Sequence, residues 1–294
     1  MTGTAAASVT CALAAAVLLA VSMVAQQRTA AAVPTSGPLV ASLIRNPRWW
    51  AAVVVDGGGY TLQVLALALG TVLIVQPLLV SSLLFAIPIS AYYTRRRPDR
   101  RTLLLAAALC IALAMFLIAG NPTAGNIDAA ATRWALPLTI TLAVAACTAA
   151  LGTAPGTPRR RAMLLGTAAG ILYGVAAALT KHVTDLMERG LPTVLGSWQL
   201  WTVITAGLTG MYLQQRAFQA GSLTASLPTL TIAEPLAAAV LGITVLGEHL
   251  DTDGLGLIAT AIAIAVMAVT TLALARTVTT PVTDKTATTE PTRS

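Results

Sequence analysis

The sequence predicts an all-α integral membrane protein of about nine transmembrane helices, built as two inverted four-helix repeats that a connector helix joins. Three observations carry this prediction: an apolar composition, nine apolar windows of membrane-spanning length, and an internal repeat. Of the 294 residues, 56% are hydrophobic and only 10% are charged, whereas soluble domains carry about 25% charged residues. Most of the chain is therefore expected to lie in a lipid bilayer.

Nine apolar windows are long enough to cross a bilayer. A helix needs about 20 residues to cross the roughly 30 Å of hydrocarbon. The windows are 4–26, 49–70, 72–93, 102–119, 134–152, 162–183, 194–215, 223–247 and 254–275. The first window lacks the basic start of a signal peptide, and its apolar part is too long for one, so we expect a helix that is retained.

A shift of 151 residues aligns the first half of the chain with the second. The shift places Trp50 on Trp201, and within the stretch 59–77 it matches six residues with identical ones. These pairs are Gly59 with Gly210, Leu62 with Leu213, Gln63 with Gln214, Ala66 with Ala217, Gly70 with Gly221 and Pro77 with Pro228. Shared low complexity of Ala- and Leu-rich helices is the alternative explanation.

The repeat has a consequence for the direction of the helices. Helices one to four correspond to helices six to nine, so equivalent helices lie five spans apart and cross the membrane in opposite directions. Inverted repeats are typical of secondary transporters, which bind their substrate near the midplane between the halves. The repeat therefore favours a transporter.

On this basis the chain divides into four parts. Residues 1–119 form the first transmembrane repeat, residues 120–161 the connector helix and a cytoplasmic linker, and residues 162–276 the second transmembrane repeat. Residues 277–294 form a Thr-rich tail with two prolines. Such a tail cannot bury apolar surface, so we expect it to be disordered in the cytoplasm.

The basic residues predict how the chain is oriented. With nine spans and an outside N-terminus, 15 of the 18 Lys and Arg residues fall in cytoplasmic segments, and only Arg133, Lys181 and Arg189 fall outside. Cytoplasmic segments of membrane proteins are enriched in Lys and Arg. We therefore expect a multi-pass protein of the cytoplasmic membrane with its N-terminus outside and its C-terminus in the cytoplasm.

Composition and spacing argue against several classes of function. The net charge is +7, but no basic face with interleaved aromatic residues is present, so a nucleic-acid partner is not expected. The cysteines Cys11, Cys110 and Cys147 are scattered singly over three windows, without the spacing of a zinc or redox site. The sequence shows no phosphate loop and no nucleophile with a neighbouring base, so neither an enzyme nor a cofactor is expected.

The window 49–70 carries a polar stripe. Asp56, Tyr60 and Gln63 lie at positions i, i+4 and i+7, and therefore share one face of a helix. Polar side chains in a lipid-embedded helix are expected to face the protein interior or a cavity. The glycines 57–59 would let a substrate or another backbone approach closely. The alternative is close helix packing, with Asp56 hydrogen-bonded to a neighbour.

The window 223–247 carries a second acid, Glu234, which Pro235 follows at once. A charge at the bilayer centre costs about 2.5–3.5 kcal/mol on insertion scales, so a functional role is the default hypothesis. Pro228 and Pro235 each free a backbone carbonyl one turn earlier and are expected to interrupt the helix. Freed carbonyls beside Thr231 and Glu234 could form a proton or cation site. A neutral or paired Glu234 on a helix–helix seam is the alternative.

The window 194–215 offers a further polar face. Trp201, Thr205 and Tyr212 lie on one side of the expected helix, and Gln214 lies near its end. These side chains could line a pathway. Equally, Trp201 could belong to the belt of aromatic residues at the membrane interface.

Other features are interpreted as structural. Three glycines recur at four-residue spacing, which permits close helix contact; they are Gly166, Gly170 and Gly174. Lys181 and Asp185 can pair one turn apart and anchor the outer end of a helix. Glu248 is assigned to a solvated helix end or to a hydrogen bond within the fold, rather than to a substrate.

The second half of the chain resembles a known family. The run Pro228–Leu250, PTLTIAEPLAAAVLGITVLGEHL, combines a proline, an apolar stretch and a closing Gly-Glu. It resembles the late signature helix of the drug/metabolite transporter (DMT) superfamily, in its EamA-like domain. The preceding run Tyr212–Ala225 resembles the helix before it, with Ala217 and Gly221 at the family's tight connection.

The first half resembles the family only through the repeat, since Arg95–Pro98 stands where a Gly-Glu would close the helix. Nine helices in four-helix repeats are similar to the NIPA-like magnesium transporter branch. The resemblance implies a secondary transporter that moves a small solute by alternating access, with proton- or ion-coupled export as the expected direction.

Three functions follow from these residues. In the first, protonation of Asp56 or Glu234 changes the relative stability of the two facing states of a solute transporter. In the second, Asp56 with Gln63, or Glu234 with freed carbonyls, holds a passing Mg²⁺, which needs only one or two carboxylates and other oxygens. The third is a non-transporting membrane scaffold. The expected partners are a small-molecule or ion substrate and the lipid bilayer; the oligomeric state stays open, with a homodimer among the options.

Overall fold

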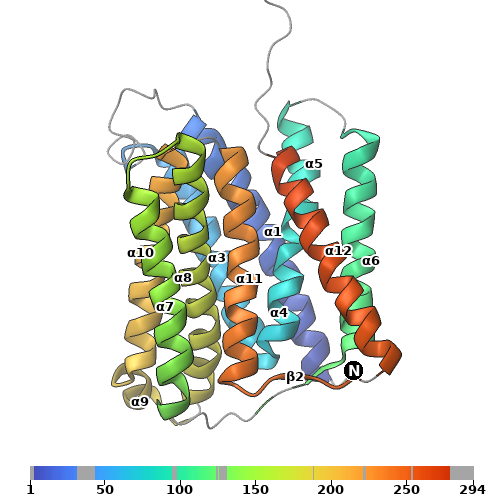
Figure 1. Cartoon of the computed structure of the whole chain (residues 1–294), viewed down its shortest axis with the longest axis vertical. Coiled ribbons are helices and arrows are strands. Elements are labelled where there is room, and N and C mark those ends of the chain that lie inside the picture. The colour runs from blue at the N-terminus through green and yellow to red at the C-terminus, as the bar shows by residue number, and fades with distance from the viewer. Residues whose placement is uncertain are drawn as a thin grey trace, which may run out of the picture.

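The computed structural model describes residues 3–31, 44–94, 98–123, 125, 131–187, 189–220, 223–252 and 254–278. The structure is a bundle of helices that run along one common direction (Figure 1). In chain order the elements are α1 (Gly3–Ala31), α3 (Pro47–Leu69), α4 (Val72–Val80), α5 (Ser82–Thr94), α6 (Arg100–Gly120), β1 (Pro122–Thr123), α7 (Ala131–Thr153), α8 (Pro158–Met187), α9 (Leu191–Leu195), α10 (Trp198–Ala220), α11 (Leu223–Thr244), β2 (His249–Leu250) and α12 (Gly254–Val278).

Eight helices in the described part of the chain are long and apolar enough to cross a membrane. Seven of the nine predicted windows correspond to one such helix each, and the window 72–93 corresponds to α4 and the start of α5, which together count as one span, Val72–Ile89. The window 194–215 differs, because α9 ends at Leu195 and α10 begins only at Trp198. Helix α10 has 23 residues, but it is too polar to count among the eight.

One boundary and one predicted helix interruption differ from the predictions. The tail expected from Thr277 begins later, because α12 continues to Val278, and residues 279–294 lie outside the described residues. Helix α11 runs without a break through both Pro228 and Pro235, so the predicted interruption is wrong. Prolines are tolerated within membrane helices because neighbouring helices, Ser and Thr side chains and small local adjustments of the helix can satisfy the freed backbone groups.

Local signals in the sequence explain where several helices begin. The side chain of Asn46 accepts a hydrogen bond from the backbone of Arg48, with Pro47 in the first turn of α3. Thr71 caps α4 in the same way through Ile74. Such caps satisfy backbone N–H groups that have no partner within the helix.

Helices α3 and α10 share details of their local structure. Both have 23 residues, and their first residues are displaced by the 151 positions that align the sequence. The indole of Trp50 donates to the carbonyl of Ile44 (2.8 Å), and that of Trp201 donates to the carbonyl of Leu195 (3.1 Å). These two bonds are related by the same displacement.

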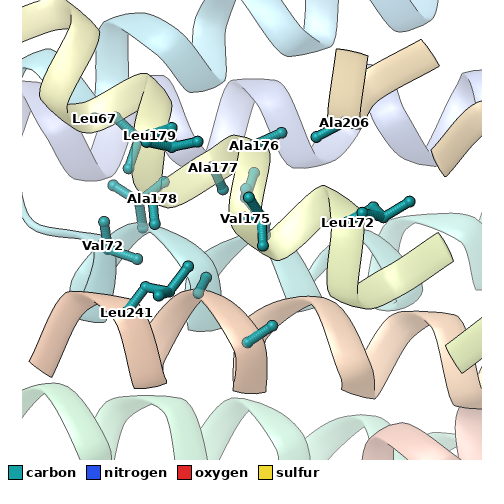
Figure 2. Packing of buried hydrophobic residues seen from close by; sticks show 14 of the residues in the cluster. Leu67, Val72, Leu172, Val175, Ala176, Ala177, Ala178, Leu179, Ala206 and Leu241 are labelled. Atoms are coloured by element: carbon teal, nitrogen blue, oxygen red, sulfur yellow. The ribbon is translucent and has the colours of Figure 1, made fainter. Parts of the chain in front are cut away.

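The core lies where α8 crosses its neighbours. Helix α8 packs against α7, α10 and α11, while α1 packs against α3, α4 and α5, and α6 packs against α12. Figure 2 shows the buried side chains of this region, with Leu179 of α8 beside Leu67 of α3. The cluster joins the first and second halves of the chain, because it also contains Val72 of α4 and Leu241 of α11.

Small residues bring α8 unusually close to α11. A Cβ atom placed on Gly166 would lie 2.6 Å from the carbonyl oxygen of Ser226, and one placed on Gly170 would lie 2.8 Å from the Cβ of Ala233. Atoms of this kind do not approach so closely in folded proteins. The predicted close helix contact at these glycines is therefore confirmed.

Glu248 forms a hydrogen bond within the fold, which was one of its two predicted roles. Its Oε1 accepts from the backbone N–H of Val72 (2.8 Å), and its Oε2 accepts from that of Leu73 (2.9 Å). The residue is 2% exposed. Burial raises the pKa of this carboxyl, and the two backbone bonds offset part of the rise. Glu248 thus caps the start of α4 from the far end of the chain.

A two-residue antiparallel pairing lies beside this cap. Pro122 and Thr123 of β1 pair with Leu250 and His249 of β2. The backbone N–H of Asp251 also donates to the carbonyl of Asn121 (3.2 Å). These contacts tie the segment after α6 to the segment after α11 at one end of the bundle.

Candidate functional site

A cavity of about 400 Å³ lies among helices from both halves of the chain. Helices α1, α3, α4 and α5 from the first half and α8, α10 and α11 from the second half contribute lining residues. The polar members of the lining are Gln26, Asp56, Tyr60, Gln63, Gln76, Ser82, Tyr173, Gln214, Gln215, Thr231 and Glu234. A volume of this size is typical of a small-molecule site.

Six of the eight residues predicted for a pathway line this cavity. They are Asp56, Tyr60, Gln63, Gln214, Thr231 and Glu234. The predicted stripe on α3 thus faces one space, as the helical spacing required. Residues far apart in the sequence meet here.

Trp201 and Thr205 do not line the cavity. Trp201 is 58% exposed, and the hydroxyl of Thr205 is occupied by the carbonyl of Trp201 (2.9 Å). The cavity-facing side of α10 instead includes Val203 and Gly207. Two residues along a helix correspond to a rotation of roughly 200°, so the face with Trp201 and Thr205 points away.

The two acids of the cavity come from different halves. Asp56 lies on α3 next to Ser22 of α1. The hydroxyl of Ser22 donates to the carbonyl of Ala52 (3.0 Å). Glu234 lies on α11, at the turn where Gly174 of α8 packs against its backbone. Among the described residues, no Lys, Arg or His lines the cavity.

Lys181 of α8 forms an ion pair outside the cavity. Lys181 pairs with Asp185 one turn along α8, with 3.1 Å between Nζ and Oδ1. This is the pair that the spacing predicted. Neither cavity acid has a described cation as its partner.

Two tyrosines carry hydrogen bonds across the cavity wall. The hydroxyl of Tyr60 lies 2.9 Å from that of Thr180, which connects α3 to α8. Tyr173 of α8 donates to Oε1 of Gln214 of α10 (2.5 Å). Sequence reasoning missed Tyr173, because it lies within the glycine stripe that was interpreted only as a packing surface.

Gln76 was also missed. It is 2% exposed and lines the cavity, and its side-chain Nε2 has no hydrogen-bond partner. The signal in the sequence was a lone amide within the apolar run VLIVQPLLV of α4. Polar side chains within membrane helices are rare and mark functional positions by default.

The described residues include no cluster of side chains typical of a dedicated metal site. No group of three or more His, Cys, Asp or Glu side chains in that part of the chain could hold a metal ion. The cysteines Cys11, Cys110 and Cys147 are all free thiols. What the cavity offers is two carboxylates, several amides and hydroxyls within apolar walls.

Comparison with known proteins identifies a relative of full length. No family model matches the chain, and no solved structure matches it. The chain is 37% identical over 275 residues to an uncharacterized protein of Corynebacterium glutamicum, across 92% of this chain and 95% of that protein. The chain therefore belongs to the same family as this uncharacterized corynebacterial protein.

Proposed function

We propose that the protein is a secondary transporter of the drug/metabolite type, which moves a small solute across the cytoplasmic membrane by alternating access. One observation carries the proposal: a cavity of about 400 Å³ between the two halves contains Asp56 and Glu234. Export coupled to protons or another ion is the proposed direction.

The depth of the acids supports this function. Asp56 lies nine residues into α3, or roughly 14 Å, and Glu234 lies eleven residues into α11, or roughly 16 Å, at a rise of 1.5 Å per residue. Both therefore lie near the middle of their helices. A proton taken up by either acid changes the charge of the cavity, and so favours one of two facing states over the other.

The internal likeness of the halves supports an inverted repeat. Helices α3 and α10, displaced by 151 residues, carry the equivalent indole bonds of Trp50 and Trp201. With nine spans, α10 is the additional membrane helix, and two of its polar residues, Gln214 and Gln215, line the cavity. The proposed orientation places the N-terminus outside and the C-terminus in the cytoplasm.

A magnesium pathway of the NIPA-like type is the second candidate. The amide of Gln63, only 5% exposed, lines the same cavity as Asp56. One or two carboxylates with further oxygens are enough for a hydrated Mg²⁺. A non-transporting scaffold is the third and least favoured function, since a scaffold does not require acids in a shared cavity.

Flux through purified protein in proteoliposomes tests these functions. Separate dyes report internal pH and free Mg²⁺ for the wild type, Glu234→Gln and Asp56→Asn. The matched control is Asp251→Asn, which removes an exposed acid outside the cavity. The solute proposal predicts proton movement that depends on members of a metabolite panel, is lost in a cavity variant and is retained in the control.

Other outcomes separate the alternatives. Mg²⁺ entry down its own gradient, lost in a cavity variant, would establish the cation pathway instead. If the protein is folded but neither dye reports proton or Mg²⁺ flux, transport through these acids would be contradicted and the scaffold favoured.

A further inference from the structure

The side of α10 that lines the cavity lacks a side chain near its middle. Five lining residues of this helix recur at intervals of three or four positions, so they share one face. They are Val203, Gly207, Met211, Gln214 and Phe218. Gly207 lies in the interior of α10, well away from both ends of the helix. The wall of the cavity is therefore bare backbone at this position.

Helix packing does not explain this glycine. Glycine destabilises the interior of a helix relative to alanine, and in membrane helices close contact with a neighbouring helix usually compensates. Gly210 of the same helix follows this rule, because a Cβ placed on it would lie 3.0 Å from Cε1 of Tyr173. A Cβ placed on Gly207 would meet no neighbouring atom within 4 Å. Gly207 thus leaves space in the cavity that the fold itself does not fill.

The surroundings of this space are mostly apolar. Val203 and Met211 flank Gly207 one turn before and one turn after it on the same face. The ring of Tyr173 packs against α10 in the next turn, and its hydroxyl donates to Gln214. The backbone N–H and C=O groups in the interior of a helix bond to one another. A hydrocarbon side chain, a thioether and an aromatic ring suit an apolar group, such as a branched alkyl group or an aromatic ring.

The two halves of the chain contribute different features at this position. The shift of 151 residues that aligns the halves places Asp56 of α3 on Gly207 of α10, and both residues line the cavity. One half therefore contributes a carboxyl group, where the other half leaves room. A solute that matches both features has a polar part and, separate from it, an apolar group.

We propose that Gly207 determines the specificity of the cavity by size. The space left by its missing side chain receives an apolar group of the solute, and the bare backbone sets how large that group can be. The substrate class is thus an amphipathic solute that carries a branched alkyl group or an aromatic ring. This inference rests on the proposed function, since it concerns the substrate of the same cavity.

Substitutions that fill the space in steps test the size limit. Solute-dependent proton flux in proteoliposomes gives the KM of each transported metabolite, in a panel whose largest apolar group ranges from a methyl group to an indole ring. In Gly207→Ala we expect the KM of solutes with a branched alkyl group or an aromatic ring to rise about 10-fold. Solutes that carry only a methyl group should keep the KM of the wild type. In Gly207→Leu the flux of the larger solutes should disappear.

Gly57→Ala and Gly57→Leu are the matched controls. A Cβ placed on Gly57 also meets no atom within 4 Å, but Gly57 is exposed and does not line the cavity. Both controls should preserve the KM of every transported solute. Because Gly207 has room for a Cβ, the Gly207→Ala protein should unfold in SDS at no lower a midpoint than the wild type. This measurement separates a loss of space from a loss of fold.

A thiol at the same position fills the space after the protein has folded. Gly207→Cys is made in a background in which Cys11, Cys110 and Cys147 are replaced with alanine. It is treated in proteoliposomes with ethyl or benzyl methanethiosulfonate, and the mass of the intact protein reports the adduct. We expect the benzyl adduct to abolish the flux of solutes with an aromatic ring, the ethyl adduct to reduce it less, and dithiothreitol to restore it. The same adducts on Gln219→Cys, at an exposed position of α10 outside the cavity, should leave flux unchanged.

Several results would overturn the size limit. They are KM values that Gly207→Leu leaves unchanged, losses of flux that are equal for solutes of every size, and full flux through the benzyl adduct of Gly207→Cys. A thiol of Gly207→Cys that does not react, while that of Gln219→Cys does, would show that the position does not face the cavity. If the wild type moves no member of the panel, the proposed function fails and the specificity role fails with it. Flux through the wild type that no change at Gly207 affects refutes the specificity role alone.

Discussion

The contact between α8 and α11 predicts opposite effects for the same substitution at two glycines. In Gly170→Ala the new Cβ would lie 2.5 Å from the carbonyl oxygen of Leu230 and 2.8 Å from the Cβ of Ala233. In Gly57→Ala on α3 the new Cβ meets no atom within 4 Å. Both substitutions add the same methyl group to the interior of a long helix, so Gly57→Ala is a matched control.

The expected magnitudes follow from two effects. Alanine is a better helix former than glycine by about 1 kcal/mol, and this gain is common to both sites. At Gly170 the methyl group must also push α11 away by roughly 1 Å, and overpacking of this kind costs about 1–3 kcal/mol. We therefore expect Gly57→Ala to raise the free energy of unfolding by up to about 1 kcal/mol. Gly170→Ala should be less stable than Gly57→Ala by about 1–3 kcal/mol.

Titration with SDS in mixed micelles, followed by far-UV circular dichroism, measures this difference. Proton flux through the same samples shows a second effect, because the backbone of Glu234 lies against the same glycine. Equal stability of the two variants would refute the argument, since it would mean that α8 and α11 do not touch at Gly170. A stable Gly170→Ala protein with normal flux would refute it more strongly.

Three further predictions concern single side chains. Glu248→Gln places an amide nitrogen against one of two buried N–H groups, so it should lower the free energy of unfolding by about 1–3 kcal/mol in the same SDS titration. Tyr173→Phe removes the hydroxyl that donates to Gln214 and should reduce solute flux in proteoliposomes while changing stability by only about 1 kcal/mol; unchanged flux would remove Tyr173 from the site. Trp201→Phe should leave flux unchanged, because the indole lies outside the cavity, and a large loss would restore it to the pathway.

The helices could be predicted from the sequence because the bilayer imposes a length. About 20 apolar residues are needed for each crossing, so the windows locate α6, α7, α8 and α12 to within a few residues. The stripe of Asp56, Tyr60 and Gln63 was equally predictable, since helical periodicity alone decides which side chains share a face.

The prediction that Trp201 and Thr205 of α10 line the pathway shows where this reasoning fails, because neither residue lines the cavity. A threonine in a membrane helix can satisfy its own hydroxyl, as Thr205 does with a carbonyl one turn earlier. Its polarity therefore does not reveal whether it faces a cavity or the outside of the bundle. Only the packing of α8 against α10 decides between the two faces.

The residues that were missed depend on contacts between distant segments. Tyr173 gains its role from Gln214 on another helix, and nothing in the glycine stripe around it indicates that bond. The pairing of β1 with β2 involves two residues on each side, too few to leave a pattern. Gln76 could have been found, because a glutamine inside an apolar run is itself a signal.

The cap at Glu248 also bears on how the protein is made. Its bonds to Val72 and Leu73 join residues that are 176 and 175 positions apart. A chain that emerges from the ribosome completes α4 long before Glu248 has been synthesised. The backbone N–H groups of Val72 and Leu73 therefore lack the carboxylate of Glu248 as a partner until α11 has been inserted. The first half of the protein can therefore enter the bilayer early, but it finishes folding only near the end of translation.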